Sequence, residues 1–146
     1  MVDVTAKPIT FRQAVARGRV MMRPETAAMI HNGGGPKGDV FSTARIAGIM
    51  AAKKTPDLIP MCHPIEMTGI EISFSSNISA GEIVIEARAG MVGRTGIEME
   101  VMTAVSVAAL TIYDMCKAVD RGIVLSDIKL IRKEGGKSGV FVRPDA

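Results

Sequence analysis

The sequence predicts an α+β sandwich, in which helices pack on one face of a largely antiparallel sheet. Apolar and polar residues alternate in two neighbouring segments, 70–75 and 83–89, as they do in strands with one buried face. Apolar residues recur at helical spacing in residues 40 to about 54, and a long apolar segment covers about 97–119. Since the neighbouring strands form hairpins, the sheet should be mainly antiparallel.

The first predicted element is a short helix. Thr10 and Gln13 have the spacing of a capping box, so a helix is expected through Arg17. Gly18 is a suitable left-handed residue to end it. A brief extended segment, residues 19–23, should follow.

A second short helix is expected next. Pro24 and Glu25 suit a first helical turn, because proline at that point loses no helical hydrogen bond. The helix should run to about Ile30 and end before the glycine run at 33–35. That run is expected to be a loop.

Asp39 is a good N-cap for the helix predicted at residues 40–54, which Pro56 should end. Two further prolines flank a Cys-His pair within residues 58–64. Proline fits neither a helix interior nor a sheet ladder, so this segment is expected to be extended.

The second half of the chain starts with the predicted hairpin and continues into the longest helix, about residues 97–119, which Gly122 should end. Two strands are expected after it, at about 123–132 and 140–143. The glycine-rich residues 134–139 lie between them and should form a loop.

The long helix is apolar around most of its circumference. One stripe should face the sheet, and it consists of Val101, Val105, Ala108, Ile112 and Met115. Val107 and Leu110 lie almost opposite, and a helix that is apolar all round is normally buried all round. A second copy of the chain would cover them, which predicts a homo-oligomer. The alternative is that the N-terminal helices cover them.

Length and composition exclude several classes. The 146 residues suit one domain, 1–146, and 47% hydrophobic content is globular usage. A net charge of +3 fits either nucleic acid or a small polyanion. The two cysteines lie far apart in the sequence and no secretory pattern is present, so the cytoplasm is the expected location. No stretch has the roughly 20 apolar residues of a membrane span.

Asp114 and Lys117 are three residues apart and therefore neighbours on one helix face. In a partly dry site, a carboxylate beside an ammonium can act as an acid and base pair, because each shifts the other's pKa. A solvated surface ion pair has the same spacing and is the better interpretation from spacing alone.

Glu98 and Glu100 belong to the first turn of the same helix, where the helix dipole favours acidic side chains whatever their function. Glu100 and Asp114 are separated by roughly 21 Å along the axis. One chain cannot bring both to a single small reacting centre. If both act in catalysis, they bind distant parts of a long substrate or meet residues of different subunits.

Two lysines, Lys37 and Lys137, are flanked by glycines, which suits phosphate capture, although neither belongs to a Walker A motif and ordinary surface loops look the same. Cys62 and His63 are adjacent, so in extended chain they point to opposite sides. No further ligand pattern accompanies them, and metal binding is not expected. A buried cysteine with a hydrogen-bonded histidine, or a histidine that contacts substrate, fits better.

An ordered set of segments from Met1 to about Phe141 resembles the cyclic pyranopterin monophosphate synthase family, known as MoaC. The segments that carry the resemblance read MVDV, KGDV, TARIAGI, LIPMCHP, GIEME, AALTIYDMCKAV and GGKSG. Each is unspecific by itself, but the ordered set is specific. The sequence departs from the family pattern in two ways. Family members often carry some residues ahead of the MVDV segment, and Arg94 stands where the family often has lysine.

The resemblance implies a ferredoxin-like fold and a hexamer, a trimer of dimers, with sites at dimer interfaces. It implies that the substrate is a 3′,8-cyclised dihydro-GTP, which is converted to cyclic pyranopterin monophosphate and pyrophosphate. No cofactor is expected, although Mg²⁺ could accompany the triphosphate. Asp114, Lys117 and Lys37 would be catalytic. The implied substrate contacts are Met61, Cys62, His63, Glu98, Met99, Glu100, Lys137 and Arg23.

Two other classes remain open. A basic RNA-binding module would need exposed aromatic residues on its central strands, and the predicted hairpin offers only Phe74. A regulatory domain would bind the nucleotide without turning it over. Neither nucleic acid nor membrane is therefore an expected partner.

Overall fold

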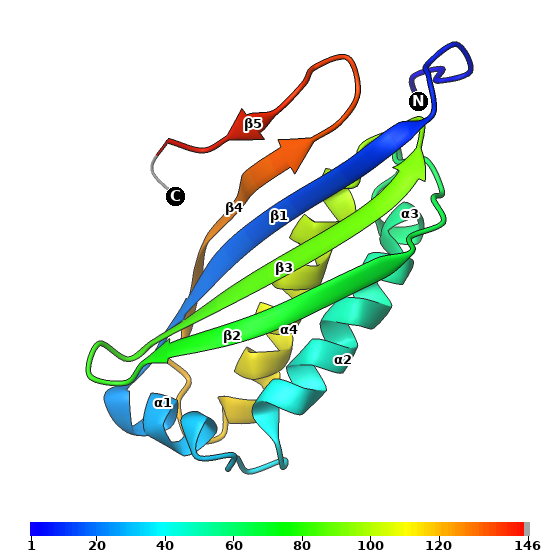
Figure 1. Cartoon of the computed structure of the whole chain (residues 1–146). Coiled ribbons are helices and arrows are strands. Elements are labelled where there is room, and N and C mark those ends of the chain that lie inside the picture. Colours follow the sequence, from blue (N-terminus) through cyan, green and yellow to red (C-terminus); the bar gives the residue numbers. More distant parts are fainter. Residues whose placement is uncertain (145–146) are drawn as a thin grey trace.

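In the computed structural model, which describes residues 1–144, helices cover one face of a five-stranded antiparallel sheet (Figure 1). The strands are ordered β2-β3-β1-β4-β5, with bounds β1 Thr10–Met21, β2 Gly69–Asn77, β3 Glu82–Gly93, β4 Val124–Glu134 and β5 Phe141–Val142. The helices are α1 Pro24–His31, α2 Val40–Lys53, α3 Thr55–Leu58 and α4 Glu98–Cys116. The βαββαβ order of β1, α2, β2, β3, α4 and β4 is that of a ferredoxin-like sandwich, so the predicted fold class is confirmed.

The predicted helix from Thr10 through Arg17 is wrong, because these residues form the first part of the central strand β1. β1 pairs with β3 from Thr10 opposite Gly93 to Met21 opposite Glu82, and with β4 on its other side. Ala14, Ala16 and Val20 are buried against the helices. Long-range pairing and this period-two burial outweigh a capping-box pattern that has only local support.

Gly18 does not end a helix but lies inside β1, at an irregularity in the pairing with β4. A Cβ atom at this position would lie 2.6 Å from Cγ1 of Val105 on α4. Glycine therefore lets the longest helix approach the middle of the sheet closely.

The helices predicted from Pro24 and from residue 40 are confirmed as α1 and α2. The Asp39 carboxylate caps α2, since its Oδ1 accepts a hydrogen bond from the Ser42 backbone N–H at 2.9 Å. α2 ends at Lys53, but the chain does not become extended at once. Leu58 ends the short helix α3 and Met61 lies in a turn, so the extended segment predicted from residue 58 is wrong in its first half.

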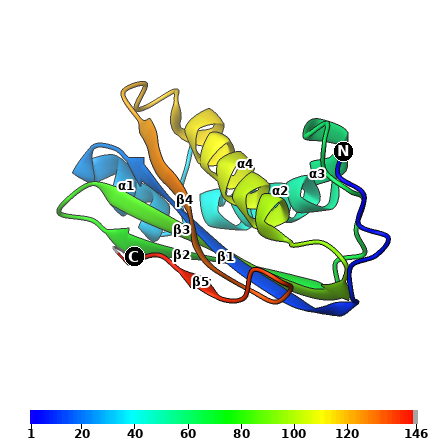
Figure 2. The ribbon, with the colours of Figure 1, turned by 90° about the horizontal axis from the view of Figure 1, so that it is seen from above.

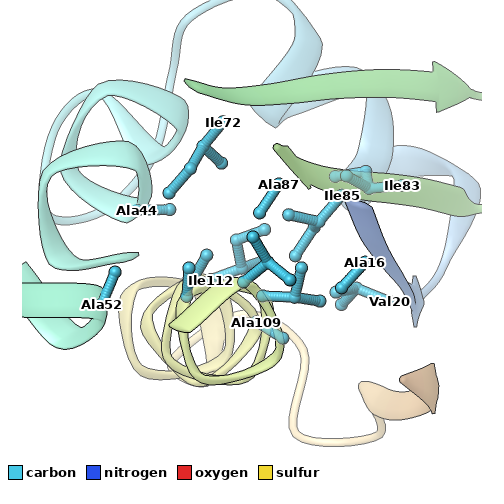
Figure 3. Close-up of a cluster of buried hydrophobic side chains, with 14 of the residues drawn as sticks. Ala16, Val20, Ala44, Ala52, Ile72, Ile83, Ile85, Ala87, Ala109 and Ile112 are labelled. Carbon is cyan, nitrogen blue, oxygen red and sulfur yellow. The ribbon is translucent and has the colours of Figure 1, made fainter. Parts of the chain in front are cut away.

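The predicted hairpin is confirmed by β2 and β3, in which Ile72 faces Ala87 across the pair. Figure 3 shows Ile83, Ile85 and Ala87 of β3 meeting Ala109 and Ile112 of α4, with α2 closing the side of the core. The strands predicted after α4 are confirmed as β4 and β5.

All five residues of the stripe predicted to face the sheet are buried, and Figure 2 shows α4 lying across the strands. On the other side of α4, Val107 is half-buried but Leu110 is 56% exposed, so the N-terminal helices leave Leu110 uncovered. α4 is long and apolar enough to span a membrane by length and composition, but 56% of that stretch is buried in this fold. A core helix has the same properties.

Candidate active site

Asp114 holds two lysines, one on each carboxylate oxygen. Lys117 Nζ lies 2.7 Å from its Oδ1, and Lys37 Nζ lies 2.7 Å from its Oδ2. Lys117 follows the last residue of α4, whereas Lys37 lies in the turn before α2, where Gly38 has a φ of 101°. We call these three residues the lysine–aspartate triad.

The ion pairs set the charge states of the triad. Hydrogen bonds from Lys117 and Lys37 lower the pKa of Asp114 to about 2, and the Asp114 carboxylate raises the pKa of Lys117. All three side chains are about half exposed, so the triad contributes little to stability. The triad is thus one carboxylate that bridges two lysines, which is more than the solvated i,i+3 pair that spacing alone suggested.

Arg23, the residue just before α1 in the chain, lies at the same end of α4 as the triad. Its guanidinium Nε lies 3.6 Å from Oδ2 of the buried Asp120, and its NH2 group donates to the Val119 carbonyl. Asp120 also accepts hydrogen bonds from the Arg23 backbone N–H at 2.9 Å and from the Thr26 hydroxyl at 3.0 Å. The start of α1 is thus fastened to the turn after α4, which carries Lys117.

The other end of α4 borders a pocket of about 180 Å³. Six of the predicted substrate contacts line it together with Thr95 and Gly96, and they are Met61, Cys62, His63, Glu98, Met99 and Glu100. Cys62 and His63 face the same pocket, although extended chain would have pointed them to opposite sides. The part of the chain that the structure describes holds no cluster of three or more potential metal-ligating His, Cys, Asp or Glu side chains.

Glu100 is 3% exposed, although it is a carboxylic acid in the first turn of a helix. Burial raises its pKa, and the neighbouring Glu98 carboxylate adds to that rise. Burial also raises the pKa of Cys62, and Glu100 adds to that rise. This pocket therefore disfavours a thiolate and favours a neutral carboxyl group.

A second, larger cavity of about 340 Å³ adjoins the first, since Met61, His63 and Glu98 line both. Its wall contains Arg12, which is only 8% exposed and has no carboxylate within ion-pair distance in residues 1–144. The Arg12 guanidinium donates instead to the backbone carbonyls of Gly93 and Arg94. A buried cation without a counter-ion marks a place where an anion would be stabilised.

Further cations surround Arg12. Lys7, Arg94 and Lys133 line the same cavity, and Lys137 joins Lys7 and Arg12 around an adjoining hollow of about 560 Å³. Lys133 Nζ lies 3.7 Å from Glu98 Oε1 and also contacts the Ser138 hydroxyl. We call the five cations Lys7, Arg12, Arg94, Lys133 and Lys137 the cationic pocket.

Lys7, Arg12 and Lys133 were missed as candidate site residues by reasoning from the sequence. Arg12 was assigned to a helix, so nothing placed it beside the glycine-rich loop. The signal that could have found it is the pair of glycines at 135 and 136. A Cβ at Gly136 would lie 1.8 Å from NH1 of Arg12, so a side chain at this position would displace the guanidinium.

The predicted site residues form two groups at opposite ends of α4, the long helix labelled in Figure 1. Asp114, Lys117, Lys37 and Arg23 lie at its C-terminal end. The pocket residues and Lys137 lie near its N-terminal end. Asp114 lies 14 positions after Glu100 in α4, a rise of roughly 21 Å, so a single chain does not unite the two groups.

The exposed aromatic surface expected of an RNA-binding sheet is lacking on β2, because Phe74 stacks on Phe41 of α2 with ring centroids 4.7 Å apart.

The fold and its side-chain clusters define a ferredoxin-like α+β protein that combines a cation-rich pocket with a lysine–aspartate triad. The chain belongs to the MoaC family, whose sequence model matches residues 1–136.

Three relatives named cyclic pyranopterin monophosphate synthase are similar along nearly the whole chain. The protein from Pelotomaculum thermopropionicum is 59% identical over 143 residues, which are 98% of this chain and 84% of the relative. The protein from a Roseiflexus species is 58% identical over 97% of this chain and 90% of its own length. That from Heliobacterium modesticaldum is 54% identical over 99% of this chain and 91% of its own length.

Proposed function

We propose that this chain is a cyclic pyranopterin monophosphate synthase of molybdenum-cofactor biosynthesis. It converts (8S)-3′,8-cyclo-7,8-dihydroguanosine 5′-triphosphate to cyclic pyranopterin monophosphate and pyrophosphate. The observation that carries the proposal is the identity of 54–59% to proteins of that name over at least 97% of this chain. The chemistry of the two side-chain groups supports it.

The cationic pocket suits the triphosphate end of this substrate. When an internal hydroxyl attacks the α-phosphorus, a new P–O bond forms, and the bond from that phosphorus to the pyrophosphate oxygen breaks. Negative charge then develops on the leaving pyrophosphate. Arg12, Lys7, Lys133 and Lys137 supply fixed positive charge there, and preorganised charge is usually the largest single contribution to catalysis. A Mg²⁺ ion on the triphosphate would add to this charge.

The smaller pocket suits the base and ribose end, which has amide, amine and hydroxyl groups. Glu98 and Glu100 offer oxygen atoms, while Met61 and Met99 offer apolar contact. Burial raises the pKa of Glu100, and in its protonated form the carboxyl group donates a hydrogen bond as well as accepting one.

The lysine–aspartate triad supplies proton transfer for opening the purine five-membered ring and building the pyranopterin. Asp114, with a pKa of about 2, is a weak base and serves to hold both ammonium groups in place. Lys117 and Lys37 then carry the mobile protons. Because its pKa is raised, Lys117 starts as the acid and acts as a base only after giving up a proton.

The two groups meet when chains assemble, with the triad of one copy completing the pockets of another. We propose a cytoplasmic homohexamer, a trimer of dimers, with residues 1–146 acting as one domain. The exposed Leu110 on α4 and the separation of about 21 Å along that helix support assembly.

The decisive experiment is a single-turnover assay of pyrophosphate release and pterin formation from the cyclised dihydro-GTP. It compares the parent with Lys117→Ala and Asp114→Asn, and with Lys53→Ala as a control at an exposed lysine that lines neither pocket. Turnover should fall at least ~100-fold in the two triad variants while substrate still binds. A well-folded parent that binds the nucleotide without turnover would instead identify a regulatory nucleotide-binding module.

A further inference from the structure

Arg94 fastens the N-terminal segment, residues 1–9, to the end of β3. Its NH1 group donates hydrogen bonds to two backbone carbonyls, those of Thr5 at 2.7 Å and Lys7 at 2.6 Å. The segment pairs with no strand. Its other hydrogen bonds include a local one from the Lys7 N–H to the Val4 carbonyl at 3.0 Å and a long-range one from the Met1 ammonium group to Met61 Sδ at 3.4 Å. Among the described residues, the Arg94 side chain thus supplies two of the three hydrogen bonds that join this segment to distant parts of the chain.

The backbone of Arg94 holds a second cation. Its carbonyl oxygen accepts a hydrogen bond from NH2 of Arg12 at 3.2 Å. Arg12 and Lys7 both line the cationic pocket, and neither forms an ion pair with a carboxylate in residues 1–144. One residue thus orders two cations, Lys7 by its side chain and Arg12 by its carbonyl group.

Order of this kind affects binding directly. A lysine on an untied segment loses backbone and side-chain freedom when it closes on an anion, and that loss weakens binding. Lys7 is spared the backbone part of this loss, because the two carbonyls on either side of Ala6 are already fixed. Arginine suits the task since its planar group can donate to two acceptors from a fixed geometry.

We propose that Arg94 is a positioning residue, whose side chain preorganises Lys7 for the polyphosphate end of the substrate, beside the Arg12 that its backbone carbonyl holds. The proposal rests on the function proposed above, and it deepens that function by assigning a role to a residue that does not itself need to touch the substrate. The Arg94 side chain acts through Lys7.

Two measurements on the same proteins test the proposal. Calorimetric titration with inorganic tripolyphosphate gives the affinity of the cationic pocket, and hydrogen exchange at the Lys7 amide gives the order of the segment. The variants are Arg94→Met and Arg94→Lys. Arg45→Met is the matched control, because Arg45 Nε also donates to a backbone carbonyl, that of Ile72 at 3.0 Å, away from the pocket.

We expect Arg94→Met to weaken tripolyphosphate binding about three- to tenfold and to speed exchange at Lys7. Arg94→Lys keeps the charge and one donor group, so it should recover part of both properties together. Arg45→Met should change neither. If Arg94→Lys restores full affinity while exchange at Lys7 stays fast, Arg94 acts by its charge alone and the proposal is wrong.

A double-mutant cycle with Lys7→Met separates positioning from direct contact. If Arg94 acts through Lys7, removing Lys7 from the Arg94→Met variant should cost clearly less affinity than removing it from the parent. Additive losses would overturn the proposal. Neither measurement needs turnover, so a parent that failed the synthase assay would refute the proposed function and leave this test readable.

Discussion

Lys37 and Asp114 are 77 positions apart in the sequence, yet Lys37 Nζ lies 2.7 Å from Asp114 Oδ2. The contact joins the turn before α2 to the last turn of α4, and it leaves Oδ1 of the same carboxylate for Lys117. Because each oxygen holds one ammonium group, Asp114 fixes the distance between two lysines that no local sequence pattern connects.

The first prediction concerns the titration of Asp114. With its pKa lowered from 3.8 to about 2, the carboxyl group should stay ionised at pH 3.5, which carbon-13 NMR of the labelled side chain can measure. Replacing Lys117 by Met removes the largest cause of the lowering, so the midpoint should rise toward 3.8. An Asp114 midpoint that is the same in parent and variant would contradict the ion pair. A carboxyl group whose pKa is lowered in the folded state stabilises that state fully above its unfolded value, here 3.8, and less as the pH falls toward the folded value. Any loss of the triad's contribution should therefore occur below about pH 4.

The second prediction concerns Glu100. Its pKa is raised in the folded state, so the folded chain binds its proton more tightly than the unfolded chain. This contribution to stability is present below the unfolded value of 4.5 and is lost as pH rises through the folded value. Glu100→Gln, which imitates the protonated form, should remove that part of the pH dependence. Urea unfolding between pH 4 and 8 measures it, and parallel curves for parent and variant would refute the assignment.

The third prediction concerns the glycine-rich loop over Arg12. Gly136 has a φ of 76° and Gly139 one of 67°, so alanine at either position should destabilise the fold by about 1–2 kcal/mol. Only Gly136→Ala also places a Cβ 1.8 Å from Arg12 NH1, whereas no atom lies within 4 Å at Gly139. Tripolyphosphate affinity should therefore fall in Gly136→Ala and not in its matched control. Equal affinities would show that the loop does not position Arg12.

The fourth prediction concerns assembly. Leu110 is exposed on the face of α4 that points away from the sheet, and a charge there should weaken a contact with a second copy. Leu110→Asp should lower the molar mass measured by sedimentation equilibrium, whereas Ile78→Asp, in the turn between β2 and β3, should not. An unchanged mass for Leu110→Asp would place the contact between copies elsewhere.

The fifth prediction concerns a site shared between copies. Asp114→Asn and Arg12→Met disable opposite ends of α4, so each alone should abolish turnover. After the two variants are unfolded together and refolded, half of randomly formed dimers would be hybrids with one intact site. Recovery of about a quarter of the parent's activity is then expected. Two separately refolded variants, mixed afterwards, are the control, and no recovery in the co-refolded sample would place each site within one chain.

The hairpin, the helix capped by Asp39 and the buried stripe of α4 were predictable, because local periodicity and capping chemistry are stronger there than any competing signal. β1 was not predictable in the same way. Thr10 and Gln13 imitate a helix start, and the small residues Ala14 and Ala16 suit a helix as well as a strand. Only pairing with β3 and β4, which are distant in the sequence, decides between them.

For the site, the sequence determined the types of side chain and, for Asp114 and Lys117, their neighbourhood on one helix face. The tertiary structure decided which distant residues join them. It brought Lys37 to Asp114, buried Arg12 without a counter-ion, passed the glycine-rich loop over it and set Arg94 against Thr5 and Lys7. These contacts depend on long-range packing, since a residue's spacing along the chain fixes its neighbours only within one helix or strand.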